Sequence, residues 1–141
     1  MLNLRTTEEA QVPAGDVAVL TDHQRSELTR LVQTAEKLSG LTFSVYVGDL
    51  ASGRKTALSL HGQLQDPAMS VLVAVDPNDR ELHIITGRQA RVGLTNHACS
   101  LAAMSMTSSF NVGDLLGGLR DGLIALGEQG RSAPVLHVRD V

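Results

Sequence analysis

The chain has 141 residues, of which 43% are apolar and 19% charged, and its formal net charge is -3. This size is typical of one domain with a sizeable core, and no apolar run approaches the roughly 18 to 20 residues that a membrane span needs. With two phenylalanines, one tyrosine, no tryptophan and no cluster of lysine or arginine, the chain lacks the charge and the stacking platforms of a nucleic-acid-binding surface.

The two ends of the chain are expected to lie outside the compact domain. Residues 1–16 are largely polar, contain proline and glycine and show no apolar periodicity, so we expect a loose leader over residues 1–20 before a domain spanning residues 21–130. The leader has neither the basic start nor the apolar core of a secretory signal, which favours a cytoplasmic location, with peripheral association with the envelope left open. Residues 131–141 are expected to form a tail or, over residues 134–138, an edge strand.

The first periodic segment predicts an amphipathic helix. Thr21 suits an N-cap, Gln24 stands at the capping-box position, and Gly40 is expected to end the helix. Residues 42–47 then alternate between apolar and polar side chains, as in a strand with one buried face. Residues 54–64 have helical spacing and predict a short crossover helix.

A second strand is expected in the middle of the sheet. Residues 70–75 are apolar and rich in β-branched side chains, as expected of a strand that is covered on both faces. Residues 76–79 have the sequence Asp-Pro-Asn-Asp, which is typical of a tight turn. The strand predicted at residues 81–86 should therefore return antiparallel.

Two helices are expected to complete the domain. The first begins near Thr95 and runs to Phe110, and the second follows Asn111, which suits a helix cap. A glycine inside a helix costs roughly 1 kcal/mol against alanine, so the glycines at positions 117, 118 and 122 need a compensating role. We expect them to allow close packing against small side chains of the preceding helix, namely Ala102, Ala103 and Ser105.

The order of the elements predicts an α/β domain, more specifically an α+β mixed sheet with helices on its faces. If the strands at residues 42–47 and 70–75 are parallel, their helical connection should be a right-handed crossover. The loop after the first strand and the turn after the second then place Asp49, Asp76 and Asp79 on one rim of the sheet.

This acidic rim is a candidate ligand site, because open α/β sheets bind ligands outside the carboxyl ends of parallel strands. Asp49, Asp76 and Asp79 could hold a hard cation such as calcium or magnesium through their carboxylate oxygens. Alternatively, Asp76 and Asp79 serve only the turn, and replacing Asp76 with Asn should then change stability little. No EF-hand spacing accompanies the rim, and the sequence carries no cofactor fingerprint.

The sequence offers no evident nucleophile. His97 and Cys99 are two residues apart in a predicted helix, where such positions point about 200° apart, so a thiol and base pair is not expected. Cys99 lies among apolar residues and is interpreted as a small core side chain. Ser105 lacks a Gly-x-Ser-x-Gly elbow, and the five histidines are scattered and interpreted as surface or half-buried side chains.

Several stretches of the chain resemble known families. The chain resembles an actinobacterial family of unknown function at residues 43–48, 71–77, 85–87, 99–110 and 113–119. The apolar strand, the glycine that closes the next strand and the pattern Phe-x-x-Gly-Asp-x-x-x-Gly-Leu are also similar to the TPM domain family.

The resemblance covers residues 21–127 and implies a TPM-like sheet flanked by helices. TPM domains include chloroplast, receptor-associated and bacterial envelope proteins, for some of which acid phosphatase activity and calcium binding have been proposed. This chain departs from their pattern, because Ala68, Met69 and Ser70 stand where TPM domains usually carry Asp-Asn-Gly before the apolar strand. The resemblance therefore does not by itself imply a metal or phosphatase site that depends on that motif.

Three functional hypotheses follow. The leading one is a TPM-like module that binds a protein partner or a small ligand without covalent chemistry of its own. The second is a metal-assisted hydrolase of phosphomonoesters, in which Asp49, Asp76 and Asp79 hold a calcium or magnesium ion that activates water. The third is a structural protein that associates with itself through an exposed helix face.

Overall fold

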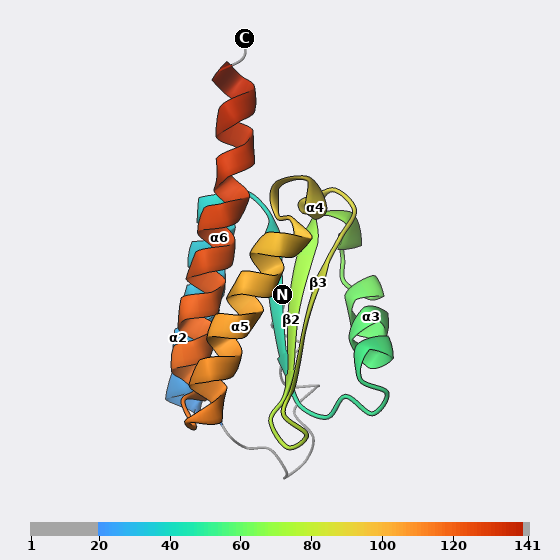
Figure 1. Ribbon diagram of the computed structural model, residues 1–141, viewed down its shortest axis with the longest axis vertical. Coiled ribbons are helices and arrows are strands. Elements are labelled where there is room, and N and C mark those ends of the chain that lie inside the picture. Colours follow the sequence, from blue (N-terminus) through green and yellow to red (C-terminus); the bar gives the residue numbers. More distant parts are fainter. Residues whose placement is uncertain (1–19, 140–141) are drawn as a thin grey trace.

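The computed structural model describes residues 20–139, and the side chains of residues 20–130. Its elements in chain order are α2 (Asp22–Ser39), β1 (Thr42–Val47), α3 (Arg54–Gly62), the short 3₁₀ helix η1 (Pro67–Met69), β2 (Ser70–Asp76), β3 (Glu81–Thr86), α4 (Ala90–Gly93), α5 (Asn96–Asn111) and α6 (Leu115–Arg139) (Figure 1). The expected order of helices and strands is confirmed, and η1 and α4 are short additions that the sequence patterns did not indicate. No helix between residues 20 and 139 combines the length and the apolar character that crossing a bilayer would require.

The three strands form one mixed sheet in the order β1-β2-β3. β1 and β2 are parallel, with Thr42 opposite Ser70. β2 and β3 are antiparallel, with Asp76 opposite Glu81 next to the hairpin turn. The predicted α+β fold with a mixed sheet in a single domain is therefore confirmed, and β2 is its central strand.

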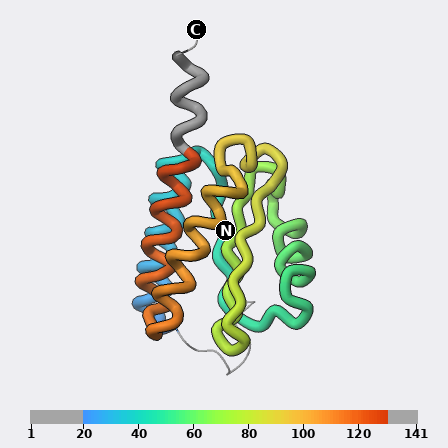
Figure 2. The backbone as a smooth tube through the Cα atoms, viewed as in Figure 1, coloured from blue at the N-terminus to red at the C-terminus, as the bar shows by residue number. Residues whose placement is uncertain are grey.

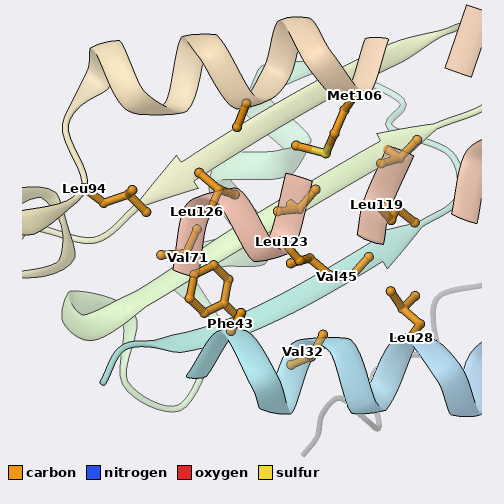
Figure 3. Packing of buried hydrophobic residues seen from close by; sticks show 14 of the residues in the cluster. Leu28, Val32, Phe43, Val45, Val71, Leu94, Met106, Leu119, Leu123 and Leu126 are labelled. Atoms are coloured by element: carbon orange, nitrogen blue, oxygen red, sulfur yellow. The ribbon is translucent and has the colours of Figure 1, made fainter. Parts of the chain in front are cut away.

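Helices cover both faces of the sheet. α2, α5 and α6 lie on one face and α3 lies on the other (Figures 1 and 2). Every residue of β2 is buried, because its successive side chains point alternately into the two layers. Val71 belongs to the larger core, shared with α2, α5 and α6 (Figure 3), whereas Leu72 and Ala74 belong to a smaller core that includes Ala57 of α3.

Side-chain caps start two of the helices where the sequence predicts them. The Thr21 hydroxyl accepts a hydrogen bond from the Gln24 backbone N–H at 3.1 Å, and the Gln24 side chain accepts one from the Thr21 N–H at 2.9 Å. This reciprocal pair is the expected capping box of α2, which ends at Gly40 in the left-handed conformation. At the start of α5, the Thr95 hydroxyl accepts a hydrogen bond from the Ala98 N–H.

The last helix differs from the expectation at both ends. Asn111 is the final residue of α5 and does not cap α6; instead the Asp114 carboxylate accepts a hydrogen bond from the Gly117 N–H at 2.9 Å. The backbone then stays helical to Arg139, so the expected tail or edge strand is replaced by helix over most of its length. Residues 1–19 of the expected leader, and residues 140–141, lie outside the described part of the chain.

The glycines of α6 allow close approach, but to larger neighbours than expected. A Cβ atom on Gly118 would lie 2.6 Å from the Phe110 ring, and one on Gly122 would collide with the Met106 side chain. The predicted partners Ala102, Ala103 and Ser105 are not the nearest neighbours of these glycines. The missing side chains leave room for two bulky residues of α5, so a large side chain on one helix fits against a bare backbone on the other.

Replacing Gly122 with Ala should lower the free energy of unfolding by about 1–3 kcal/mol, because the new Cβ would collide with the fully buried Met106 side chain and force it to repack. Urea denaturation followed by circular dichroism measures the change. Gly62→Ala is the control, since a Cβ there meets nothing within 4 Å, and it should leave stability unchanged or raise it by up to about 1 kcal/mol. Equal stability of the two variants would contradict the close contact between α5 and α6.

Candidate functional site

The acidic rim is organised around a buried carboxylate at the end of β2. Asp76 is only 1% exposed. One of its oxygens accepts a hydrogen bond from the Leu50 N–H at 2.9 Å, and the other accepts one from the Asp79 N–H at 3.1 Å. A single side chain thus ties the loop after β1 to the turn between β2 and β3.

The other two acidic residues of the rim are exposed. Asp49 follows β1, and its main-chain carbonyl accepts a hydrogen bond from the Tyr46 hydroxyl at 2.7 Å. Asp79 stands in the hairpin turn, and its backbone N–H is what contacts Asp76. In the part of the chain that the structure describes, no group of three or more His, Cys, Asp or Glu side chains is arranged to hold a metal ion. The calcium or magnesium site therefore stays a prediction of the sequence.

Replacing Asp76 with Asn should lower the free energy of unfolding by about 1–3 kcal/mol, because the amide nitrogen cannot accept the hydrogen bond that one carboxylate oxygen accepts now. This is larger than the small effect expected from a turn residue alone, since Asp76 is buried. Chemical denaturation measures it. Asp79→Asn is the matched control and should stay within about 0.5 kcal/mol, because its side chain is exposed. Similar losses in both variants would argue against the bridging role of Asp76.

Tyr46 lies beside the acidic rim, and the pKa of its phenol depends on the nearby carboxylates. Burial raises the pKa of the Tyr46 hydroxyl above its ordinary value, and the nearby carboxylates of Asp49 and Asp76 raise it further. Negative charge next to the ring and loss of solvent both disfavour the phenolate.

The pKa of Tyr46 should therefore lie above ~10 in the folded protein and fall to about 10 in urea. Because the folded protein holds this proton more tightly than the unfolded chain, its contribution to stability is present below ~10 and is lost as the pH rises through the folded pKa. The chain has one tyrosine and no tryptophan, so the ultraviolet absorbance of the phenolate measures this residue alone. A folded-state midpoint at or below that of the unfolded chain would contradict the assigned environment.

The remaining sequence candidates lie apart from the rim. Cys99 is half-buried against the larger core, as predicted, and burial raises the pKa of its thiol, an effect that Arg91 partly offsets. His97 is exposed, but His61 is buried and donates from Nε2 to the Ser70 carbonyl at 3.0 Å, so the expectation of surface or half-buried histidines is wrong for His61. The hydrogen bond of His61 and the core packing of Cys99 favour structural roles for both residues.

A groove that the sequence did not indicate lies between the β2–β3 hairpin and the C-terminal half of α5. Its volume is about 650 Å³. The hairpin turn and the connection from α5 to α6 lie at the same end of the molecule (Figure 1), which is where the groove forms. Apolar residues supply much of the lining, namely Val75, Pro77, Leu82, Ala103, Phe110 and Leu115. The other lining residues are Asp76, Arg80, Glu81, His83, Thr107, Asn111 and Gly113.

The acidic residues of the lining direct their side chains to the opposite face of the sheet. Asp76 bonds to Leu50, which belongs to the smaller core on the α3 side. Glu81 lies against Gly53 at the start of α3, where a Cβ atom would be 3.1 Å from its carboxylate oxygen, and it also pairs with His83 at 3.1 Å. Since side chains alternate along a strand, Leu82 faces the α5 side instead. The groove is thus apolar on its sheet side, with Arg80 as the cationic residue of its lining.

Two features distinguish the segments that form this groove, one in the sequence and one in the backbone. The sequence of α5, residues 96–111, contains no Asp, Glu, Lys or Arg, which is unusual for a helix with an exposed face. Arg80 adopts a φ of 56° in the turn. Neither signal indicates that α5 and the hairpin meet, because that depends on how helix and sheet pack.

Solved structures share this fold. The NMR structure of BA42 protein from the psychrophilic bacterium Bizionia argentinensis aligns with a TM-score of 0.74 at 16% sequence identity, covering 85% of this chain and 87% of that one. The N-terminal domain of cg2496 protein from Corynebacterium glutamicum aligns with a TM-score of 0.59 at 14% identity, covering 84% of this chain and 76% of that one. At these identities the likeness concerns the fold alone.

Two curated relatives come from strains of Mycobacterium tuberculosis. They are the uncharacterized protein Rv2468c of strain H37Rv and the uncharacterized protein MT2543 of strain CDC 1551. Each is 35% identical to this chain over 80 residues, which is 55% of this chain and 47% of the relative. The match thus spans about half the length of these relatives.

A family model covers most of the chain. Residues 8–126 match the family described as Domain of unknown function (DUF5130). The match includes every element from α2 to α5, the hairpin and both walls of the groove. The protein therefore belongs to the DUF5130 family.

Proposed function

We propose that this domain is a non-catalytic binding module and that the groove between the β2–β3 hairpin and α5 is its binding site. The observation that carries the proposal is the make-up of the groove, in which apolar side chains are combined with polar ones such as Arg80, Thr107 and Asn111. Small-molecule sites are concave and mostly apolar, with volumes of about 300 to 1,000 Å³, and the volume of about 650 Å³ falls in that range. A small ligand, or an apolar side chain of a protein partner, fits such a surface.

The groups around the groove favour binding over covalent chemistry. Thr107 supplies a hydroxyl, but His83, the histidine of the lining, is hydrogen-bonded to Glu81. The Cys99 thiol is outside the lining, and its raised pKa keeps it protonated at neutral pH. A nucleophile activated by a neighbouring base, which covalent catalysis requires, is therefore not part of this proposal.

Metal-assisted phosphomonoester hydrolysis at Asp49, Asp76 and Asp79 stays the alternative hypothesis, and the likeness to TPM domains stays a prediction as well. The contacts of Asp76 favour a structural role, because both of its oxygens already accept backbone hydrogen bonds. The groove, by contrast, has surface left for a ligand.

The experiment is to block the groove from α5. Thr107→Trp places a large ring into the groove from an exposed position, so the fold should tolerate it. Nile red, a neutral dye whose fluorescence rises in apolar surroundings, serves as the probe. We expect saturable binding by the unmodified protein and an affinity lower by about tenfold or more in Thr107→Trp.

Ser108→Trp is the matched control, because Ser108 is the adjacent exposed residue of α5 and lies outside the groove lining. Its affinity for Nile red should stay within about twofold of the unmodified protein. Amide chemical shifts should change with the dye at residues 75–83 and 103–115, the two sides of the groove. Equal binding by the two variants, or shift changes elsewhere on the domain, would contradict the assignment of the site.

A further inference from the structure

Arg80 holds an unfavourable backbone conformation at the mouth of the groove. Its φ of 56° lies in the left-handed region, and among the described residues it is the only residue other than glycine with a positive φ. Glycine and asparagine adopt this conformation readily, whereas an arginine is held there against its preference. Such outliers gather at functional sites, where the side chain is retained for what it does.

The charge of Arg80 has no carboxylate partner in the described structure. The one ion pair among residues 20–130 joins His83 to Glu81. The Asp76 oxygens accept hydrogen bonds from the Leu50 and Asp79 backbones, and Glu81 faces α3 across the sheet. The guanidinium is therefore available to a negatively charged group that enters the groove.

Further hydrogen-bond donors stand on the opposite wall. Thr107 and Asn111 are one helical turn apart on α5, so their side chains share one face of the helix, and both are exposed and line the groove. A hydroxyl, a primary amide and a guanidinium together suit the two oxygens of a carboxylate. The same groove is lined by apolar side chains, among them Leu82 and Phe110.

We propose that the ligand of this groove is a small amphiphile with an alkyl chain and a terminal carboxylate. The carboxylate pairs with Arg80 and the chain lies on the apolar floor beside Leu82 and Phe110. A planar guanidinium binds a carboxylate through two parallel hydrogen bonds, which a lone alkyl chain or a cation cannot provide. This inference rests on the proposed function, because it names the ligand class of the same site.

The test compares three probes that share one alkyl chain and differ in the head group: octanoate, octanol and octyltrimethylammonium. Each is titrated into the full chain below its aggregation limit, and amide chemical shifts report both the site and the affinity. We expect all shifts to fall at the groove and octanoate to bind about fivefold more tightly than octanol, as one exposed charge pair allows. Octyltrimethylammonium should bind more weakly than octanol.

Arg80→Asn removes the positive charge and should keep the backbone conformation, because asparagine tolerates the left-handed region. Its affinity for octanoate should fall to that for octanol, while octanol binds as before. Arg88→Asn is the matched control, since Arg88 is an exposed arginine outside the lining, and it should keep the preference for octanoate. Thermal unfolding of both variants checks that they remain folded.

The outcomes distinguish the two proposals. Equal binding of octanoate and octanol at the groove, or an unchanged preference in Arg80→Asn, would overturn the carboxylate class and leave the groove as a binding site. Tighter binding of the ammonium probe would also overturn it. If none of the probes shifts the groove amides, and Nile red fails to bind there too, the proposed function itself is wrong.

Discussion

The burial of β2 on both faces is the constraint on which the rest of the structure depends. A strand that is buried along its whole length needs a layer on each side, and the chain supplies α2, α5 and α6 on one side and α3 on the other. The strand also needs partners for its backbone groups, which β1 and β3 provide. Its last residue, Asp76, is therefore buried, and a buried carboxylate needs hydrogen-bond partners.

The way in which Asp76 is satisfied connects the core to the groove. By accepting hydrogen bonds from the loop after β1 and from the hairpin turn, this side chain ties these two connections together at one end of the sheet. Asp76 thus fastens the turn that carries Arg80, an exposed residue of the groove lining. α5 packs closely against α6 at Gly118 and Gly122, which have no side chains. The groove lies between α5 and the hairpin.

The family and the fold of this chain are established, whereas its binding site is proposed from the groove. Membership of the DUF5130 family and the likeness to BA42 protein concern the chain and its fold, at an identity that carries no residue roles across. The functional proposal comes from the groove itself, whose lining combines apolar side chains with the cationic residue Arg80. In the acidic rim that the sequence indicated, Asp76 accepts two backbone hydrogen bonds that connect the loop after β1 to the hairpin turn.

Local patterns in the sequence were enough to determine α2, α3, the three strands, the cap at Thr21 and the start of α5 near Thr95, because apolar periodicity and capping act within a few residues. They were not enough for the start of α6, where Asp114 rather than Asn111 caps the helix, since both side chains suit that role locally. Tertiary structure alone decided the partners of the glycines, the burial of Asp76 and the placement of Arg80, Thr107 and Asn111 around one groove. These features bring together residues of different helices and strands, and only the packing of α5 and α6 against a sheet covered on both faces determines how closely such residues approach.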